Sequence, residues 1–474
     1  MLNSLGDARP DKAGIWAAYV SKPNKPWLSA LRTYIALLVF LGSYLVLTVV
    51  GNLLYFTNVG EVMGKTAIVG FDIRNFSKAG SPGYWALLFL PFVVAPPIVI
   101  FVRKLAAKMG GYVAALPGLS RPAYCLLLGA LYAYAFFSLW NADAARLLLR
   151  PADYISALDS RFQLMEALGF WPQVTIKSLL FTLSIYGMVE ATSRNDYFWS
   201  ILTAFNLIAM SIILILLNMK WPLVLFYAAN LATIMLFAKH KIVGGLLFTS
   251  LALLSYFSVS LLLLRATSSP VVVTRIESAP SSPTSEQLDR TLAEAKIWRE
   301  QLGTQAETAE VSRESFSNVL TLAAGAIVNR MAQPFPYYYQ IFAQSEGKCG
   351  SLETRILRQR SPCQPSNLVY AAMFDDRFSG VGTAPQGPHI TGFALQGWLG
   401  ALIELVCTSI VLGLFAAASG VEGTVQATIT VMGAVTGYFF SQLPFEGPLI
   451  YDHGAFWWMI PLLLYAAWNR IPLR

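Results

Sequence analysis

The sequence carries little charge. Asp, Glu, Lys and Arg together make up 13% of its 474 residues, whereas hydrophobic residues make up 55%. A soluble globular domain carries roughly 25% charged residues, so a soluble fold is excluded as the main architecture. The apolar residues are gathered in blocks of about 20, the length that an α-helix needs to cross roughly 30 Å of hydrocarbon. The chain is therefore predicted to be an all-α polytopic membrane protein.

The sequence also lacks the motifs of several functional classes. It has no Gly-rich phosphate loop, no Ser/His/Asp motif and no metal-binding motif, so we expect no cofactor and no metal. No hydrophilic block could form a soluble catalytic domain, which argues against an ATP-driven pump. The net charge of +8 is explained by basic flanks that fix membrane topology, and no nucleic-acid partner is predicted.

About ten apolar segments have the length and composition of membrane spans. They are residues 30–57, 83–102, 122–141, 176–193, 198–217, 222–238, 242–264, 393–418, 425–443 and 451–468. Basic residues gather at alternate ends of these segments, including Arg9, Lys12, Lys22, Lys25 and Arg32, then Arg103, Lys104, Lys108 and Arg121. By the positive-inside rule, both termini are predicted to be cytoplasmic.

This topology divides the chain into three parts. Residues 1–264 form an N-terminal bundle of about seven helices, and residues 393–474 form a C-terminal bundle of about three. Between them, residues 265–392 form one large loop on the extracytoplasmic side, which begins with a Ser/Pro linker. Leu288, Leu292 and Trp298 then recur close to helical spacing, so an amphipathic helix is predicted there.

The large loop contains a closely spaced pair of cysteines, Cys349 and Cys363. In an oxidising compartment two cysteines at this spacing favour a disulfide. Closing such a loop would stabilise the fold by about 3 kcal/mol.

Arginines and aromatics also gather in this loop. The arginines are Arg330, Arg355, Arg358, Arg360 and Arg377, and the aromatics include the run Tyr337, Tyr338 and Tyr339. Guanidinium groups bind phosphate oxygens bidentately, which suits a polyprenyl pyrophosphate or an anionic lipid head group. Tyrosine faces can stack on sugar rings. The alternatives are a solvated charged loop and an ordinary interfacial aromatic belt.

Proton transfer has a small set of candidates. The chain has three histidines, and His389 lies where the large loop re-enters the membrane. Histidine titrates near neutrality and could accept a proton from a hydroxyl group, although a helix-capping histidine would also fit this position. Asp375 and Asp376 are alternative bases. Glu404 lies within a predicted span, where a carboxylate is costly and is a functional candidate by default.

These features resemble the bacterial O-antigen and exopolysaccharide polymerases of the Wzy type, which are related to the O-antigen ligases. The resemblance is carried by the span number, the late Arg-rich loop, and the segment from Gly387-Pro-His389 to Gly397-Trp-Leu-Gly400. The chain departs from the family's Arg-x10-Gly pattern, because Ser366 follows Arg355 and Pro388 follows Arg377 at that spacing.

The resemblance implies a metal-independent glycosyltransferase with a GT-C-like fold in the bacterial inner membrane. Its substrates would be undecaprenyl pyrophosphate-linked oligosaccharides at the periplasmic face, surrounded by membrane lipids, with room for a chain-length regulator as a partner. The arginines would hold pyrophosphate, and His389, Asp375 or Asp376 would act as the base. Three other interpretations remain open: an O-antigen ligase, a polyprenyl-phosphate-sugar glycosyltransferase, and a lipid-linked glycan flippase or transporter.

Overall fold

The computed structural model is helical throughout the part of the chain that it describes. That part comprises residues 26–58, 60, 71–144, 163–194, 196–217, 220–238, 244–245, 248–255, 285–302, 329, 331–344, 364–374, 383–420, 423–451 and 454–468. Helices account for 87% of these residues, which contain no strand. The predicted all-α class is therefore confirmed for the described chain.

Six helices are long and apolar enough to cross a membrane. They are α2–η1–α3 (Pro26–Leu54), α5 (Pro82–Leu105), α7 (Arg121–Asn141), α10–η3–α11 (Phe170–Ser193 as a span, with α11 ending at Arg194), α12 (Tyr197–Leu216) and α20 (Pro388–Ala418). The shorter helices α13 (Lys220–Phe237), α21 (Thr424–Phe440) and α22 (Ala455–Trp468) pack among them. The protein is thus a polytopic membrane protein, while the count of ten spans and the sidedness stay predictions.

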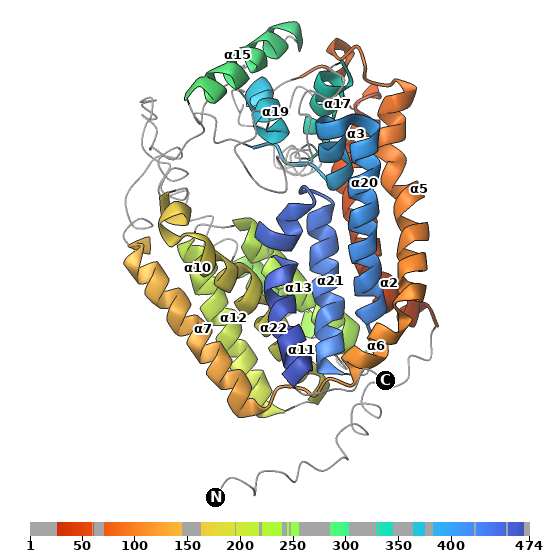
Figure 1. The fold of residues 1–474 in the computed structure, drawn as a ribbon. Helices are drawn as coiled ribbons and strands as arrows, with labels where there is room; N and C mark the ends of the chain where they lie inside the picture. The colour runs from red at the N-terminus through yellow and green to blue at the C-terminus, as the bar shows by residue number, and fades with distance from the viewer. Residues whose placement is uncertain are drawn as a thin grey trace, which may run out of the picture.

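The helices that precede α20 in the large loop lie together at one end of the molecule (Figure 1). They are α15 (Ser285–Leu302), α17 (Pro334–Gln344) and α19 (Pro365–Phe374), and with residues 383–387 we call them the head. The start of α2 and the end of α22 lie at the opposite end of the bundle. The amphipathic helix predicted from Leu288, Leu292 and Trp298 is confirmed as α15.

Helix α15 packs on the rest of the head through one face. Ala295, Trp298 and Leu302 on that face are buried, and Leu292 is partly buried against the same cluster. The Nη2 atom of Arg299 donates a 2.7 Å hydrogen bond to the carbonyl oxygen of Ala371 in α19. Burial of this apolar stripe explains why a helix of such polar composition joins the fold.

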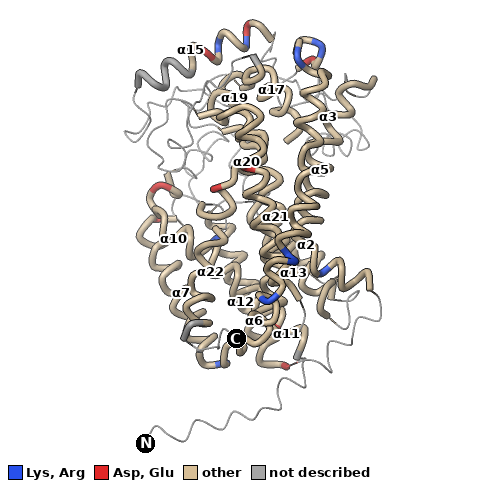
Figure 2. Tube along the Cα trace, turned by 45° about the vertical axis from the view of Figure 1, so that its right-hand side comes forward, with Lys and Arg blue, Asp and Glu red and all other residues tan. Residues whose placement is uncertain are grey.

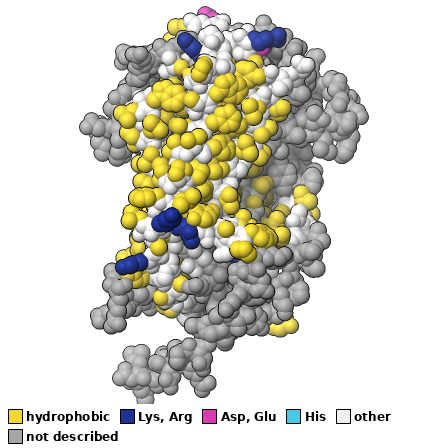
Figure 3. Space-filling model, turned by 90° about the vertical axis from the view of Figure 1, so that its right-hand side faces the viewer, with side chains coloured by type: hydrophobic (Ala, Val, Ile, Leu, Met, Phe, Trp, Pro, Cys, Tyr) yellow, Lys and Arg dark blue, Asp and Glu magenta, His cyan; other side chains and the backbone are white. Residues whose placement is uncertain are grey.

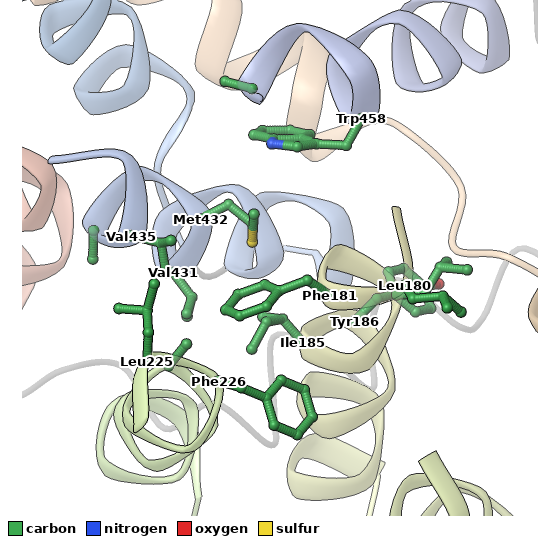
Figure 4. Close-up of a cluster of buried hydrophobic side chains, with 14 of the residues drawn as sticks. Leu180, Phe181, Ile185, Tyr186, Leu225, Phe226, Val431, Met432, Val435 and Trp458 are labelled. Atoms are coloured by element: carbon green, nitrogen blue, oxygen red, sulfur yellow. The ribbon is translucent and has the colours of Figure 1, made fainter. Parts of the chain in front are cut away.

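The core of the bundle is mainly aliphatic, and part of it lies where α11, α13 and α21 meet. Phe181, Ile185, Phe226 and Met432 lie together there, and Trp458 of α22 belongs to the same cluster (Figure 4). We call the cluster to which they belong the bundle core.

The outer surface of the bundle is apolar. In Figure 3 hydrophobic side chains cover most of the described part of one face, and Lys and Arg side chains gather above and below them. Along the Cα trace the basic positions likewise lie toward the two ends, and the middle is mostly uncharged (Figure 2). Val93 and Phe101 of α5 are 71% and 65% exposed, an exposure that a hydrocarbon environment would stabilise.

Small residues allow close helix crossings within the bundle. A Cβ atom at Gly437 of α21 would lie 2.2 Å from the carbonyl oxygen of Ala36 in α2, and one at Gly413 of α20 would lie 2.7 Å from Cβ of Val102 in α5. Close backbone approach through small residues is typical of helix packing in membranes. These glycines therefore set how near α2, α5, α20 and α21 can come.

Helix α20 begins at Pro388, earlier than the predicted start at 393, and it is broken. Gln396 and Gly397 leave the helical region, and Gly397 adopts φ +63°. Glycine tolerates this left-handed conformation, which other residues rarely adopt. Beyond the break the chain comes back toward its own start, because a Cβ atom at Gly400 would lie 2.2 Å from the carbonyl oxygen of Gly392. The re-entry segment singled out in the sequence is therefore a short helix, a sharp bend and a long helix.

Candidate functional site

His389 lies in the first turn of α20, where the head meets the bundle. Its side chain is fully buried. The Nε2 atom of His389 lies 3.0 Å from the hydroxyl oxygen of Tyr44 in α2, and the tautomer of the imidazole decides which of the two donates. The two rings meet edge to face, with centroids 5.1 Å apart. These two contacts with Tyr44 fix the orientation of the imidazole ring of His389.

The local structure of α2 places Tyr44 at this position. Tyr44 is followed directly by η1 (Leu45–Val49), a π-helical stretch that leads into α3 (Val50–Leu54). In an α-helix, residues spaced by four drift around the axis because a turn contains 3.6 residues. The wider π turn reduces this drift. As a result Tyr44, Thr48 and Asn52 stay near one face of the helix, and all three side chains are fully buried.

Asn52 joins three segments by hydrogen bonds. Its Nδ2 atom donates to the carbonyl oxygen of Thr48 at 2.8 Å and to that of Ala332 at 3.1 Å. The hydroxyl group of Tyr84 in α5 donates to its Oδ1 atom. Asn52 therefore connects α3, the start of α5 and the segment that leads into α17.

A second hydrogen bond holds the segment that leads into α17. Tyr55 is buried, and its hydroxyl group donates a 2.6 Å hydrogen bond to Oδ1 of Asn329.

Gln386 precedes His389 by three residues and is fully buried. Its Nε2 atom donates a 2.6 Å hydrogen bond to the carbonyl oxygen of Met331. Its Oε1 atom, Nδ1 of His389 and Oγ1 of Thr48 are all buried and make no hydrogen bond. We call Tyr44, Thr48, Asn52, Tyr84, Gln386 and His389 the junction site.

Buried polar atoms without partners are costly, each by about 1–3 kcal/mol. Native proteins keep few of them, and functional sites are among the places where they persist. The junction site offers two acceptors, an amide oxygen and an imidazole nitrogen in its Nε2-protonated form, and a hydroxyl group that both donates and accepts. Each of these groups can form a hydrogen bond to a hydroxyl group, and the imidazole nitrogen can also accept a proton.

The tyrosines predicted to stack on glycan are packed inside the protein. Tyr337 meets Phe76 edge to face at 4.8 Å, and the ring of Tyr339 lies parallel to that of Phe393 at 5.6 Å. The hydroxyl group of Tyr338 donates a 2.9 Å hydrogen bond to the carbonyl oxygen of Ala384. All three residues are buried in a cluster that we call the aromatic core. Stacking on a sugar would therefore require this core to open.

Most of the other predicted site residues lie outside the described residues. These are Arg330, Arg355, Arg358, Arg360, Arg377, Asp375, Asp376, Cys349 and Cys363. Their predicted roles stay predictions. Asn329 and Met331, the chain neighbours of Arg330, both accept hydrogen bonds from residues in or beside the junction site.

Glu404 is described, and it is buried at 5% exposure in the long part of α20. It follows Ala401 of the aromatic core and precedes Leu405 of the bundle core. The carboxyl group thus lies at the level where the two cores meet.

Five residues of the junction site were missed from the sequence: Tyr44, Thr48, Asn52, Tyr84 and Gln386. Asn52 had a usable signal, because it is a polar residue inside an apolar run and polar residues within spans are often functional. Tyr44 had none, since aromatic residues are common in spans.

The described residues include no group of three or more His, Cys, Asp or Glu side chains that could hold a metal ion. Comparison of the chain with protein-family models, with curated proteins and with solved structures gives no match.

Proposed function

We propose that this protein is a membrane glycosyltransferase that polymerises lipid-linked oligosaccharide repeat units. A glycan on undecaprenyl pyrophosphate would be transferred to a repeat unit on a second carrier lipid at the periplasmic face of a bacterial inner membrane. The observation that carries the proposal is the junction site. It combines an imidazole and its hydrogen-bonding phenol at the contact between an apolar bundle and a large helical head.

In the proposed reaction the acceptor hydroxyl oxygen attacks the anomeric carbon of the donor glycan. The bond from that carbon to the pyrophosphate oxygen breaks, and the pyrophosphate leaves with the electron pair. Tyr44 engages Nε2 of His389, so Nδ1, which has no partner, is the atom that takes the acceptor proton. Since His389 is fully buried, the junction site must open to admit the acceptor.

The arginines predicted from the sequence would stabilise the leaving group. Arg355, Arg358, Arg360 and Arg377 would neutralise the departing pyrophosphate, and Arg330 would hold the second carrier. Electrostatic stabilisation of developing charge usually lowers the barrier of such a transfer more than any other single effect. A double Arg355→Gln/Arg360→Gln variant that kept normal polymer length and yield would contradict this part.

The test is deletion of the gene in its host, followed by electrophoresis of surface and lipid-linked polysaccharides. Loss of the long ladder with single repeat units retained would support a polymerase. Intact long chains stranded on the polyprenyl carrier would mean a ligase instead. An unchanged profile would reject both.

Complementation of the deletion then tests the junction site. His389→Ala should reduce polymer yield by about 10²–10⁴-fold, the usual contribution of a general base. Tyr44→Phe keeps the ring and loses the hydrogen bond, so its yield should fall less. Tyr338→Phe is the matched control, because it makes the same change at a buried phenol that donates its hydrogen bond to the carbonyl oxygen of Ala384. Full activity of His389→Ala, at wild-type protein levels, would reject the assignment.

A second candidate, a lipid-linked glycan transporter, is favoured by a separate observation. Transporters are often built with interrupted helices and with charges in the membrane interior. Here α20 is broken at Gln396 and Gly397, and Glu190 and Glu404 are buried within spans. Reconstitution into vesicles with a fluorescent polyprenyl pyrophosphate glycan separates the two functions. Translocation without chain extension would favour the transporter.

A further inference from the structure

A buried arginine lies in the first half of α2, the same helix that carries Tyr44 of the junction site, and toward the end of the bundle opposite the head. Arg32 in α2 is 6% exposed. Its Nη2 atom donates a hydrogen bond to the carbonyl oxygen of Leu236, in the last turn of α13, and its guanidinium lies 5.5 Å from the ring centroid of Phe237. The last carbonyl groups of a helix lack partners within it and form the negative end of its dipole. Nη2 of Arg32 therefore caps the C-terminal end of α13.

The other two nitrogens are unexplained by the fold. Nε and Nη1 of Arg32 are buried and have no hydrogen-bond acceptor. The ion pairs found within the described part of the chain are Arg74 with Asp72 and Arg121 with Asp196, so Arg32 has no carboxylate there. A buried guanidinium that keeps its charge without a counter-ion is strongly destabilising. An anion bound beside Arg32 would supply both the missing hydrogen-bond acceptors and the counter-charge.

The surroundings of Arg32 fit the interface between water and hydrocarbon. Helix α2 bends at Tyr34, whose backbone φ and ψ lie outside the helical region. Before this bend Trp27 is 60% exposed, and Ser29, about one turn before Arg32, is exposed as well. Trp is enriched at the level of lipid head groups. The protein surface therefore comes within one turn of Arg32 at a depth suited to head groups.

A second cation, Arg103, contacts the residue at the bend. Nη1 of Arg103, in the last turn of α5, donates a 2.9 Å hydrogen bond to the hydroxyl of Tyr34, and its guanidinium lies over the Tyr34 ring. Lys104 follows it. Clustered basic residues beside a membrane attract anionic lipids. The charge at this end is thus complementary to a lipid phosphate.

We propose that Arg32 binds the phosphate group of an anionic phospholipid at this end of the bundle. The planar guanidinium matches phosphate oxygens, and the atoms without acceptors, Nε and Nη1, supply the donors. The site is structural and selective for lipid, and it does not depend on the proposed transfer reaction.

The experiment measures lipid-dependent thermal stabilisation of the purified full chain in detergent. Dioleoylphosphatidylglycerol is titrated against dioleoylphosphatidylcholine, with soluble glycerol 1-phosphate as a third probe. Arg32→Met retains an apolar side chain of similar length and is expected to fold, because replacing buried charge by apolar groups is often neutral or stabilising. Arg32→Lys keeps the charge with fewer donors. The matched control is Arg121→Gln, which removes a cation at the same end that already pairs with Asp196.

The wild-type protein should be stabilised by phosphatidylglycerol well below the concentration needed for phosphatidylcholine. Arg32→Met should weaken this response about tenfold, from the loss of charged hydrogen bonds, Arg32→Lys should weaken it less, and Arg121→Gln should respond like the wild type. An unchanged response in Arg32→Met would overturn the proposal. An equal loss in Arg121→Gln would indicate general attraction of charge and would overturn it too. So would equal stabilisation by glycerol phosphate, which would replace the lipid by a soluble ligand.

Discussion

Buried polar side chains form hydrogen bonds differently in the bundle core and in the aromatic core. Within the bundle many of them bond the helix that carries them: Thr428 donates to the carbonyl of Thr424, Thr436 to that of Met432, and Ser409 to that of Leu405. Around the aromatic core they bond between elements, as Tyr338 does to Ala384 and Asn52 to Ala332.

The difference shows where tertiary stability comes from in each region. A bond within one helix also exists when that helix stands alone in the membrane, so it adds little to the packing of helices. A bond between elements forms only when the elements are assembled. The bundle should therefore depend on close packing at its small residues, and the aromatic core should depend on both ring packing and its connecting hydrogen bonds.

The largest expected effect is at the crossing of α2 and α21. Gly437→Val should destabilise the protein by about 3 kcal/mol or more, because the new side chain would meet the backbone of Ala36. Thermal and SDS-induced unfolding of the purified protein measure this. Gly42→Ala in α2 is the control, since nothing lies within 4 Å of its Cβ position. If Gly437→Val unfolded like the wild type, close packing would not hold the bundle.

Two buried asparagines test the comparison directly. Asn52→Leu should cost about 2 kcal/mol, because it leaves Tyr84 and the carbonyl of Ala332 without their partner. Asn230→Leu in α13 should cost much less, because Nδ2 of Asn230 bonds the carbonyl of Phe226 in its own helix and Oδ1 has no partner. Equal losses in the two variants would break the comparison.

A smaller effect is expected within the head. Tyr338→Phe should cost about 1 kcal/mol through loss of its hydrogen bond to Ala384. Tyr339→Phe should cost less, since its hydroxyl lies 3.4 Å from that of Ser81 and the hydrogen bond is weak. Unfolding of both variants in parallel gives the order, and the reverse order would contradict the assignment.

The smallest effect is expected at a hydroxyl group that bonds its own helix. Thr436→Val in α21 should change the free energy of unfolding by no more than about 0.5 kcal/mol, since the lost bond does not connect helices. A loss comparable with that of Asn52→Leu, measured in the same unfolding assay, would mean that Thr436 contributes to tertiary packing.

Patterns of hydrophobicity predicted much of the helical structure. Apolar blocks of about 20 residues indicate spans because of the thickness of the hydrocarbon, and the spacing of Leu288, Leu292 and Trp298 predicted α15. The break at Gln396 and Gly397 was not predicted, because the apolar run continues across it. Gly397 itself could have signalled a bend, but glycine is also common within membrane helices.

Of the residues in the junction site, only His389 was predicted from the sequence. His389 was chosen for its chemistry and its position at the membrane re-entry. Its partner Tyr44 is 345 residues away in the sequence, and no local pattern connects the two. Tyr337, Tyr338 and Tyr339 were given a binding role because of their type, and the structure buries them.

The sequence by itself determined that this protein is an integral membrane protein, that it is helical, and that a large polar segment precedes its last spans. These properties follow from composition and periodicity, which act over one helix at a time. Only the tertiary structure decided that Tyr44 and Asn52 meet His389 and Ala332, and that Arg32 caps α13. Such contacts depend on which helices are neighbours and how each is rotated, and small residues, a π turn and a glycine bend set both.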